Sequence, residues 1–156
     1  MFVSPTYGRM SLTEVLYQVE RYVDVSEHPH YKLIIGTDSQ NHGEETTMVT
    51  AIIVHRIGKG ARFFFRRRRH PKIHDLRQRV YMETSYSLTL VQEMQQHEAF
   101  QRLYDLPIEI HIDIGTTGAT RTMIQEIVGW VTAVGYTVKI KPQSYGASAV
   151  ADRFTK

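Results

Sequence analysis

The chain has 156 residues, of which 42% are hydrophobic and 22% charged. These values are typical of a globular protein and predict a single domain over residues 1–156, with neither a disordered tail nor a coiled coil. No segment has the roughly 20 apolar residues of a membrane-spanning helix, and the first ten residues lack the apolar core of a signal peptide. We therefore expect a cytoplasmic protein that does not contact a membrane. The absence of cysteine excludes disulfides, zinc–thiolate sites and cysteine nucleophiles.

The formal net charge is +3, and the positive charge is concentrated in one segment. Residues 62–79 contain eight lysines and arginines and one acid, whereas the rest of the chain is acidic. Such a run favours binding to a polyanion, because Lys and Arg displace counterions from phosphates. The alternative is a solvated basic strand that resists edge-to-edge aggregation. If the run binds nucleic acid, the contacts are expected from Arg66, Arg67, Arg68, Arg69 and Lys72.

The apolar pattern predicts an α/β domain that begins with a helix. Residues 11–14 (SLTE) form a capping box, and apolar residues follow at helical spacing up to Val23. A buried strand is expected over residues 31–37, ended by the polar run that starts at Asp38. Two strand-like segments follow, 47–57 and 61–69, joined by a glycine-bearing turn. The three strands should form an antiparallel meander.

A helix that starts after Pro71 carries an acid on its apolar face. The apolar spacing extends this helix to about Gln96, and Glu83 lies on the same side as its apolar residues. Glu83 should therefore point at the sheet rather than at water. A single inward glutamate needs a partner, which in the simplest case is Arg79, four residues earlier on the helix.

The remaining segment predicts two more strands. Residues 108–114 alternate strictly, so four isoleucines share one face, while the other face carries Glu109, His111 and Asp113. A helix over 119–134, a strand over 136–141 and a short final helix follow. Strands separated by helices run parallel through right-handed crossovers, so the sheet is mixed and its parallel strands end at one edge.

Four acids converge at that edge in this arrangement: Asp38, Glu83, Asp113 and Asp152. Carboxylates without cysteine suit Mg²⁺ or Mn²⁺, and two such ions can activate water and stabilise the leaving oxygen in phosphodiester hydrolysis. Each acid alone has a structural alternative, because acids often occupy turns and helix surfaces. The order of the elements and the place of each acid within them together favour a metal site.

These residues resemble a known group, the ribonuclease H-like superfamily, and within it the YkuK-type branch of predicted nucleases. The resemblance covers nearly the whole chain and rests on residues 35–40 (IGTDSQ), Glu83, residues 111–115 (HIDIG) and the segment 141–153. It implies a five-stranded mixed sheet flanked by helices, to which this chain adds an N-terminal helix. It also implies a two-metal site that cuts phosphodiester bonds.

Carried over residue by residue, the resemblance implies that Asp38 bridges both ions. Glu83 and Asp113 would help to hold one ion, and Asp152 would complete the other. Further candidates near the site are Lys141, Tyr145 and Arg153 for phosphate contacts, and His111 for supporting a ligand or carrying a proton. RNA, DNA and their hybrid all remain open as substrates.

Three other interpretations compete with a nuclease. Residues 112–118 (IDIGTTG) resemble the phosphate-binding turn of sugar kinases and actin-like ATPases, but 156 residues leave no room for the second lobe of those proteins. The histidines lack the helical spacing of a hydrolytic zinc site, since Pro71 argues against a helix between His70 and His74. The strongest alternative is a non-catalytic nucleic-acid-binding or protein-interaction module on the same fold. Divalent-cation binding at the acids separates this alternative from a nuclease.

Overall fold

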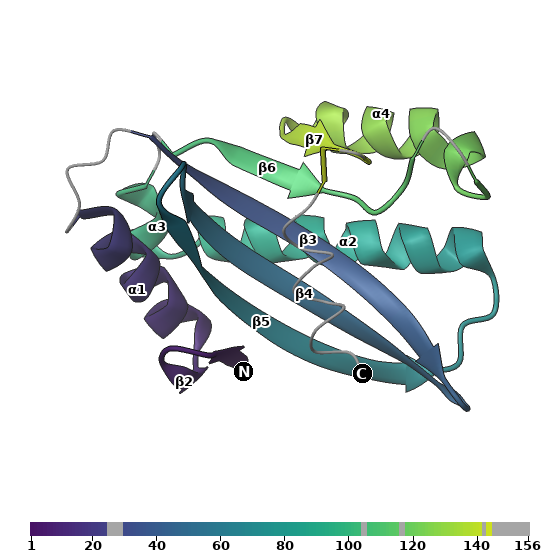
Figure 1. The fold of residues 1–156 in the computed structure, drawn as a ribbon, viewed down its shortest axis with the longest axis horizontal. Helices are drawn as coiled ribbons and strands as arrows, with labels where there is room; N and C mark the ends of the chain where they lie inside the picture. Colours follow the sequence, from purple (N-terminus) through teal and green to yellow (C-terminus); the bar gives the residue numbers. More distant parts are fainter. Residues whose placement is uncertain (25–29, 104–105, 116–117, 142, 145–156) are drawn as a thin grey trace.

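The computed structural model describes residues 1–24, 30–103, 106–115, 118–141 and 143–144. In these residues one sheet of seven strands has the order β2-β1-β5-β4-β3-β6-β7 (Figure 1). The strands are β1 (Phe2–Ser4), β2 (Gly8–Met10), β3 (Tyr31–His42), β4 (Glu45–Arg56), β5 (Gly60–Pro71), β6 (Ile108–His111) and β7 (Thr137–Lys139). The helices are α1 (Leu12–Asp24), α2 (Leu76–Gln95), α3 (Glu98–Gln101) and α4 (Ile124–Val134), with a 3-10 turn, η1 (Arg121–Met123), before α4. None of the helices within these ranges has the length and apolar character that crossing a membrane requires.

The centre of the sheet is an antiparallel meander of three strands, each twelve residues long. β3 pairs with β4 along its whole length, from Tyr31↔Arg56 to His42↔Glu45, and β4 pairs with β5 over the same twelve residues. Short turns connect the strands, and Gly43 between β3 and β4 has φ 58°, where a residue with a side chain would be strained. β4 is therefore paired on both sides from end to end.

β6 and β7 extend the sheet in parallel. β6 pairs with β3 from Leu33↔Ile108 to Gly36↔His111, and β7 pairs with β6. One hydrogen bond to β7 follows the end of β6: the backbone N–H of Ile112 donates to the Lys139 carbonyl at 3.0 Å. The predicted mixed sheet with parallel late strands is confirmed.

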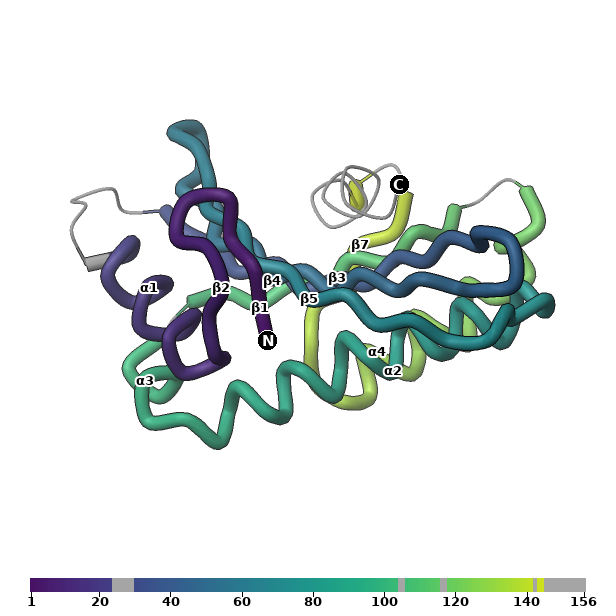
Figure 2. Tube along the Cα trace, turned by 90° about the horizontal axis from the view of Figure 1, so that it is seen from below, coloured from purple at the N-terminus to yellow at the C-terminus, as the bar shows by residue number. Residues whose placement is uncertain are grey.

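Apolar side chains fill both faces of the sheet. In Figure 2, α2 and α4 lie against the same face. The larger core cluster occupies this helix-covered face and joins Leu33, Ile35 and Phe64 to Leu16 of α1 and Leu90 of α2. The face turned away from α2, called here the distal face, carries a smaller buried cluster: Ile34, Val49, Ala51, Ile53 and Phe65. Successive side chains of each meander strand therefore point to opposite faces of the sheet.

Local sequence signals set the helix ends. Ser11 and Glu14 form the predicted capping box, in which each side chain accepts a hydrogen bond from the backbone N–H of the other at 3.2 Å. The Asp75 side chain caps α2 by accepting from the backbone N–H of Arg77 at 3.0 Å. Gly135 ends α4 with φ 107°, as expected for a glycine that terminates a helix.

The prediction of five strands is wrong. The sheet has seven, because residues 2–10 fold into a hairpin whose Val3 pairs with Phe65 of β5. Strands of three residues are too short to show an alternation in sequence. The predicted N-terminal helix is present as α1.

Several predicted element ends are also wrong. β3 does not end before Asp38 but continues to His42, because β4 supplies backbone partners along its full length. The strand predicted over 108–114 ends at His111, where its pairing with β3 stops. The helix predicted from residue 119 begins as α4 at Ile124, after η1. The predicted final helix lies outside the described residues.

Candidate active site

Asp38 and Asp113 lie close to the point where the parallel pairing of β3 with β6 ends. Thr37 and Ser39 of β3 hydrogen-bond to side chains of α2, so Asp38, between them, lies on the distal face. Asp38 and Asp113 each follow the last parallel pair, Gly36↔His111, by two residues along their chains. Both side chains are partly buried. The structure therefore places Asp38 within β3 and Asp113 two residues beyond the end of the neighbouring strand β6.

Glu83 reaches the same region from α2. It is 7% exposed, and its Oε2 accepts a hydrogen bond from Ser39 Oγ at 2.6 Å. Arg79, one turn earlier, donates from Nε to Ser39 Oγ at 3.1 Å and from Nη2 to the Ser39 carbonyl at 3.0 Å. The prediction that Glu83 faces the sheet is confirmed. Arg79, the partner that the helix spacing suggested, bonds to Ser39, and Ser39 in turn bonds to Glu83.

Burial and like charges set the ionisation of Glu83. Burial raises the pKa of Glu83 from 4.5 to about 8, and the negative charges of Asp38 and Asp113 add to this rise. The hydrogen bond from Ser39 and the charge of Arg79 act in the opposite direction without cancelling it. Glu83 therefore holds a proton at neutral pH when no cation is bound. The charges of both aspartates therefore act on the Glu83 carboxyl group.

A row of hydroxyl groups continues the contact between β3 and α2. Thr37 Oγ1 lies 2.9 Å from Ser87 Oγ and 3.0 Å from Thr50 Oγ1, and all three residues are buried. Sequence reasoning gave Thr37 and Ser87 no partner. A signal for this row was present, because Thr37 and Ser39 are two apart on a strand, and Ser87 and Glu83 are four apart on a helix. Both spacings place the two residues on one face, and the paired contacts fix α2 on the sheet.

Asp113 forms an ion pair with Lys141 just beyond β7. Lys141 Nζ lies 2.8 Å from Asp113 Oδ1, with the two side chains 58% and 27% exposed. The backbone N–H of Lys141 donates to the Ile114 carbonyl at 2.8 Å, which holds this segment beside β6. Gly115 favours the close approach, since a Cβ there would lie only 3.2 Å from the Lys141 Cβ. Lys141 is thus at the site, and its contact with phosphate stays a prediction.

His111 is buried beside Asp113 in sequence but bonds to another acid. It is 3% exposed, and its Nε2 lies 2.9 Å from Glu109 Oε1. Burial lowers the pKa of His111, against the opposing effect of Glu109. Burial alone would raise the pKa of Glu109, but the His111 hydrogen bond and the charge of Lys32 together lower it. A supporting or proton-carrying role for His111 stays a prediction.

The basic run divides between the two faces of β5. Arg66 points toward α2, where its Nη1 lies 3.5 Å from Glu93 Oε2. Arg68 lies over the ring of Tyr86, with its guanidinium carbon 5.2 Å from the ring centre. These two arginines therefore have partners on the helix-covered side of the sheet.

The alternate arginines lie on the distal face. Arg67 and Arg69 are exposed, and the register Asp38↔Val49↔Arg67 places Arg67 on the same face as Asp38, two strands away. At the usual strand spacing these two backbone positions are roughly 10 Å apart. Lys72 follows β5 and is partly buried. On the distal face, the predicted basic surface therefore includes only two of the four consecutive arginines, Arg67 and Arg69.

Three predicted site residues lie outside the described residues: Asp152, Tyr145 and Arg153. Among the described residues, no three or more Asp, Glu or His side chains are close enough together to hold a metal ion. The donor chemistry nevertheless fits a hard divalent cation, because Asp38, Glu83 and Asp113 offer only carboxylate oxygens. The raised pKa of Glu83 is compatible with this, since a bound cation would stabilise the buried carboxylate and offset the charges of Asp38 and Asp113.

The chain belongs to the ribonuclease H-like family, whose model matches residues 14–156. It is also similar to the uncharacterized protein YkuK of Bacillus subtilis (strain 168). The two are 35% identical over 171 aligned positions, which cover 100% of this chain and 97% of YkuK. No solved structure matches the chain. The resemblance inferred from the acid-bearing motifs is thereby confirmed.

Proposed function

We propose that this protein is a divalent-metal-dependent nuclease that hydrolyses phosphodiester bonds in nucleic acid. The observation that carries the proposal is Glu83, a buried carboxyl group that α2 holds against Ser39, the neighbour of Asp38 on β3. Burial and the charges of Asp38 and Asp113 raise the pKa of Glu83 to about 8. Carboxylates held together without a cation destabilise the fold, so their placement is better explained by function than by stability. Perturbed pKa values of this kind are typical of active sites.

Asp38, Glu83 and Asp113 would hold Mg²⁺ or Mn²⁺, and Asp152 is the proposed further ligand. Two such ions, when bound, supply positive charge to the attacking and leaving oxygens of a phosphodiester.

The chain's own residues orient the ligands and the nucleic acid. Ser39 holds one oxygen of Glu83, and Arg79 fixes Ser39 at both its hydroxyl and its carbonyl. Arg67 and Arg69 would bind phosphates on the distal face, which is the face that presents Asp38.

A non-catalytic nucleic-acid-binding module on the same fold is the second candidate. The ion pair between Lys141 and Asp113 favours it, because an ammonium group at 2.8 Å neutralises this carboxylate without a metal ion. In a nuclease, Lys141 would leave Asp113 when a cation binds and would be available to a phosphate. The two candidates therefore differ in whether Mn²⁺ binds at the acids.

The test is Mn²⁺-dependent cleavage of single-stranded RNA, single-stranded DNA, duplex DNA and an RNA–DNA hybrid. Wild type is compared with Asp38→Asn and with Glu98→Gln, a control that removes an exposed carboxylate from α3. We expect metal-dependent cleavage of at least one substrate by wild type and the control, and none by Asp38→Asn. The melting temperature of Asp38→Asn should not fall, because the substitution removes a negative charge near Glu83.

Cleavage that persists in Asp38→Asn would refute the proposed site. If folded wild-type protein binds the substrates but cuts none of them, catalysis is refuted and the binding module is supported.

A further inference from the structure

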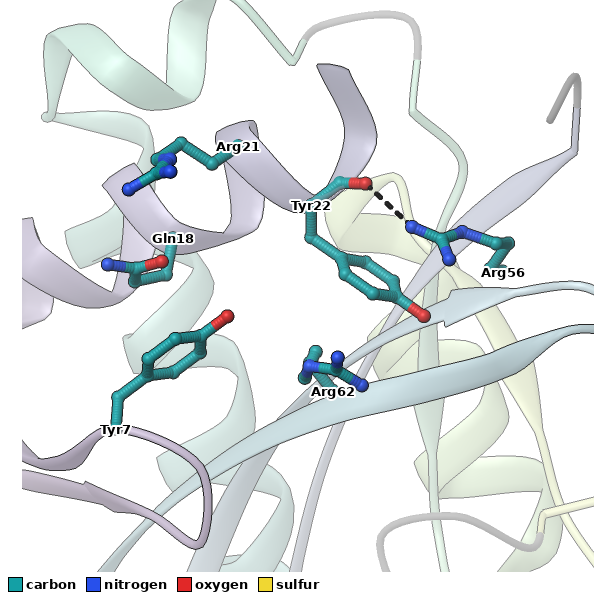
Figure 3. A pocket seen from close by; sticks show the side chains of 6 residues that line it. All are labelled: Tyr7, Gln18, Arg21, Tyr22, Arg56 and Arg62. Atoms are coloured by element: carbon teal, nitrogen blue, oxygen red, sulfur yellow. Dashed lines mark hydrogen bonds between the residues drawn. The ribbon is translucent and has the colours of Figure 1, made fainter. Parts of the chain in front are cut away.

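A pocket of about 550 Å³ lies beside α1 (Figure 3). Its strand residues Arg56 and Arg62 lie at the end of the meander away from Asp38. The pocket is formed by α1, the turn between β1 and β2, and the adjoining ends of β4 and β5. The described residues that line it are Tyr7, Gln18, Arg21, Tyr22, Arg56 and Arg62. Its volume is within the range of about 300 to 1,000 Å³ that is usual for small-molecule sites. The proposed nuclease mechanism uses none of these residues.

Arginines dominate the lining of this pocket. Figure 3 shows Arg21 on α1, with Arg56 and Arg62 across the opening on the strands. None of the described lining residues is acidic, and no carboxylate in the described parts of the chain forms an ion pair with these three arginines. Arg56 and Arg62 both lie near the Tyr22 ring, and like charges near one another raise the free energy of the protein unless an anion binds. The pocket therefore favours an anionic ligand.

Contacts within the protein fix the positions of two guanidinium groups, those of Arg56 and Arg62. Arg56 donates from Nε to the Tyr31 hydroxyl and from Nη2 to the Tyr22 carbonyl, both at 3.1 Å. The Tyr22 ring lies between two cations, with its centre 4.0 Å from the guanidinium carbon of Arg56 and 5.0 Å from that of Arg62. Arg62 Nε is buried and has no hydrogen-bond partner among the described residues. A buried donor without a partner is costly and indicates a missing acceptor.

The pocket also offers an aromatic surface. Tyr7 stacks on Phe64 with ring centres 6.2 Å apart, yet it is 40% exposed, and in Figure 3 its hydroxyl points into the opening, with the Gln18 amide nearby. Guanidinium groups bind phosphate through paired hydrogen bonds, and nucleobases stack on exposed tyrosine rings. We propose that this pocket binds a nucleoside monophosphate group, present either as a free nucleotide or as the phosphorylated end of a strand. The arginines hold the phosphate, and the side of the Tyr7 ring turned away from Phe64 stacks against the base.

Ligand binding in this pocket does not depend on the acids at Asp38, Glu83 and Asp113. Arg56 pairs with Tyr31, which precedes Asp38 on β3 by seven residues, or roughly 23 Å of strand. A single nucleotide cannot span that distance, so its binding requires neither the carboxylates nor a metal ion. The test is therefore carried out in EDTA.

The experiment is calorimetric titration with AMP, adenosine and inorganic phosphate. AMP is expected to bind at least about tenfold more tightly than adenosine or phosphate, because only AMP uses both the arginines and the ring. Arg21→Gln and Arg62→Gln should each weaken AMP binding by about tenfold. Arg121→Gln, the same change at an exposed arginine of η1, should have no effect.

Competition then identifies the source of the nucleotide. A short DNA strand with a 5′-phosphate that displaces AMP, while its 5′-hydroxyl counterpart does not, indicates a strand end. AMP binding that neither strand displaces indicates a free nucleotide.

The proposal is overturned if AMP does not bind at millimolar concentration, if adenosine or phosphate binds as tightly as AMP, or if AMP binding survives both substitutions. Arg62→Gln removes a cation from the Tyr22 ring and could unfold the protein, so Arg21→Gln, on the exposed surface of α1, is the second variant. Melting curves verify the fold of both. AMP binding without nuclease activity would refute only the proposed function, and cleavage without AMP binding would refute only this pocket.

Discussion

Replacing Glu83 by glutamine tests the electrostatics of the acid site without a substrate. Glu83→Gln keeps the shape of the side chain and an oxygen that can accept from Ser39 Oγ, but it removes the titration. With a pKa of about 8 in the folded protein against 4.5 in the unfolded chain, wild type keeps a proton that the unfolded chain has lost. Its free energy of unfolding therefore falls as pH rises through this interval, whereas the glutamine variant lacks this contribution.

The size of the effect follows from the pKa difference. Each pH unit inside the interval lowers the free energy of unfolding by about 1.4 kcal/mol, so the full shift corresponds to roughly 5 kcal/mol. From about pH 5 to about pH 9, the variant should gain about 4 kcal/mol of stability relative to wild type. This is a large share of the roughly 5 to 15 kcal/mol that stabilises a typical domain.

The assay is urea denaturation in EDTA across this pH range. Wild type and Glu83→Gln are measured beside Glu98→Gln, which reports the effect of removing one surface carboxylate. A difference between variant and wild type that stays constant with pH would refute the raised pKa. Repeating the series with Mn²⁺ should flatten the pH dependence of wild type, because a bound cation favours ionised carboxylates. A slope that Mn²⁺ leaves unchanged would count against the metal site alone.

Three further predictions test other parts of the molecule. Arg67→Gln and Arg69→Gln should weaken nucleic acid binding and lower the slope of log affinity against log salt by about one for each lost phosphate contact, measured by fluorescence anisotropy; an unchanged slope would contradict the basic surface. Lys141→Gln frees Asp113 and should tighten Mn²⁺ binding by up to about fivefold in calorimetry, and weaker binding would show that the ammonium does not compete with the cation. Leu90→Ala should lower the free energy of unfolding by about 2 to 5 kcal/mol in urea, and a loss below about 1 kcal/mol would show that α2 is not packed as described.

The element order and the inward direction of Glu83 could be predicted because both rest on the period of apolar residues. Helical spacing sets which side of α2 is buried, and that side includes Glu83. The strict alternation over residues 108–114 predicted a strand, which the structure forms over Ile108–His111, and its parallel pairing with β3 places it beside that strand. Both predictions rest on the spacing of residues close in sequence, and the structure confirms both.

The length of β3 could not be predicted, because its second half is polar. Residues 38–42 resemble a loop in sequence, but their polar groups find partners far along the chain. Ser39 bonds to Glu83, and Asn41 accepts from Thr46 and donates to the Ile73 carbonyl. Likewise, the pair of Asp113 and Lys141 depends on how the chain continues past two strand ends, which no periodicity encodes.

The two pairings of β3 differ greatly in sequence separation. Short turns join β3, β4 and β5, whereas Asp38 and Asp113 are 75 residues apart and are brought together by the four residue pairs between β3 and β6. Amide hydrogens of β4 should therefore exchange most slowly with solvent, and those of β6 faster. An opening that detaches β6 from β3 separates the two aspartates while leaving the meander folded. Mild denaturant should therefore abolish the acid site before it unfolds the sheet.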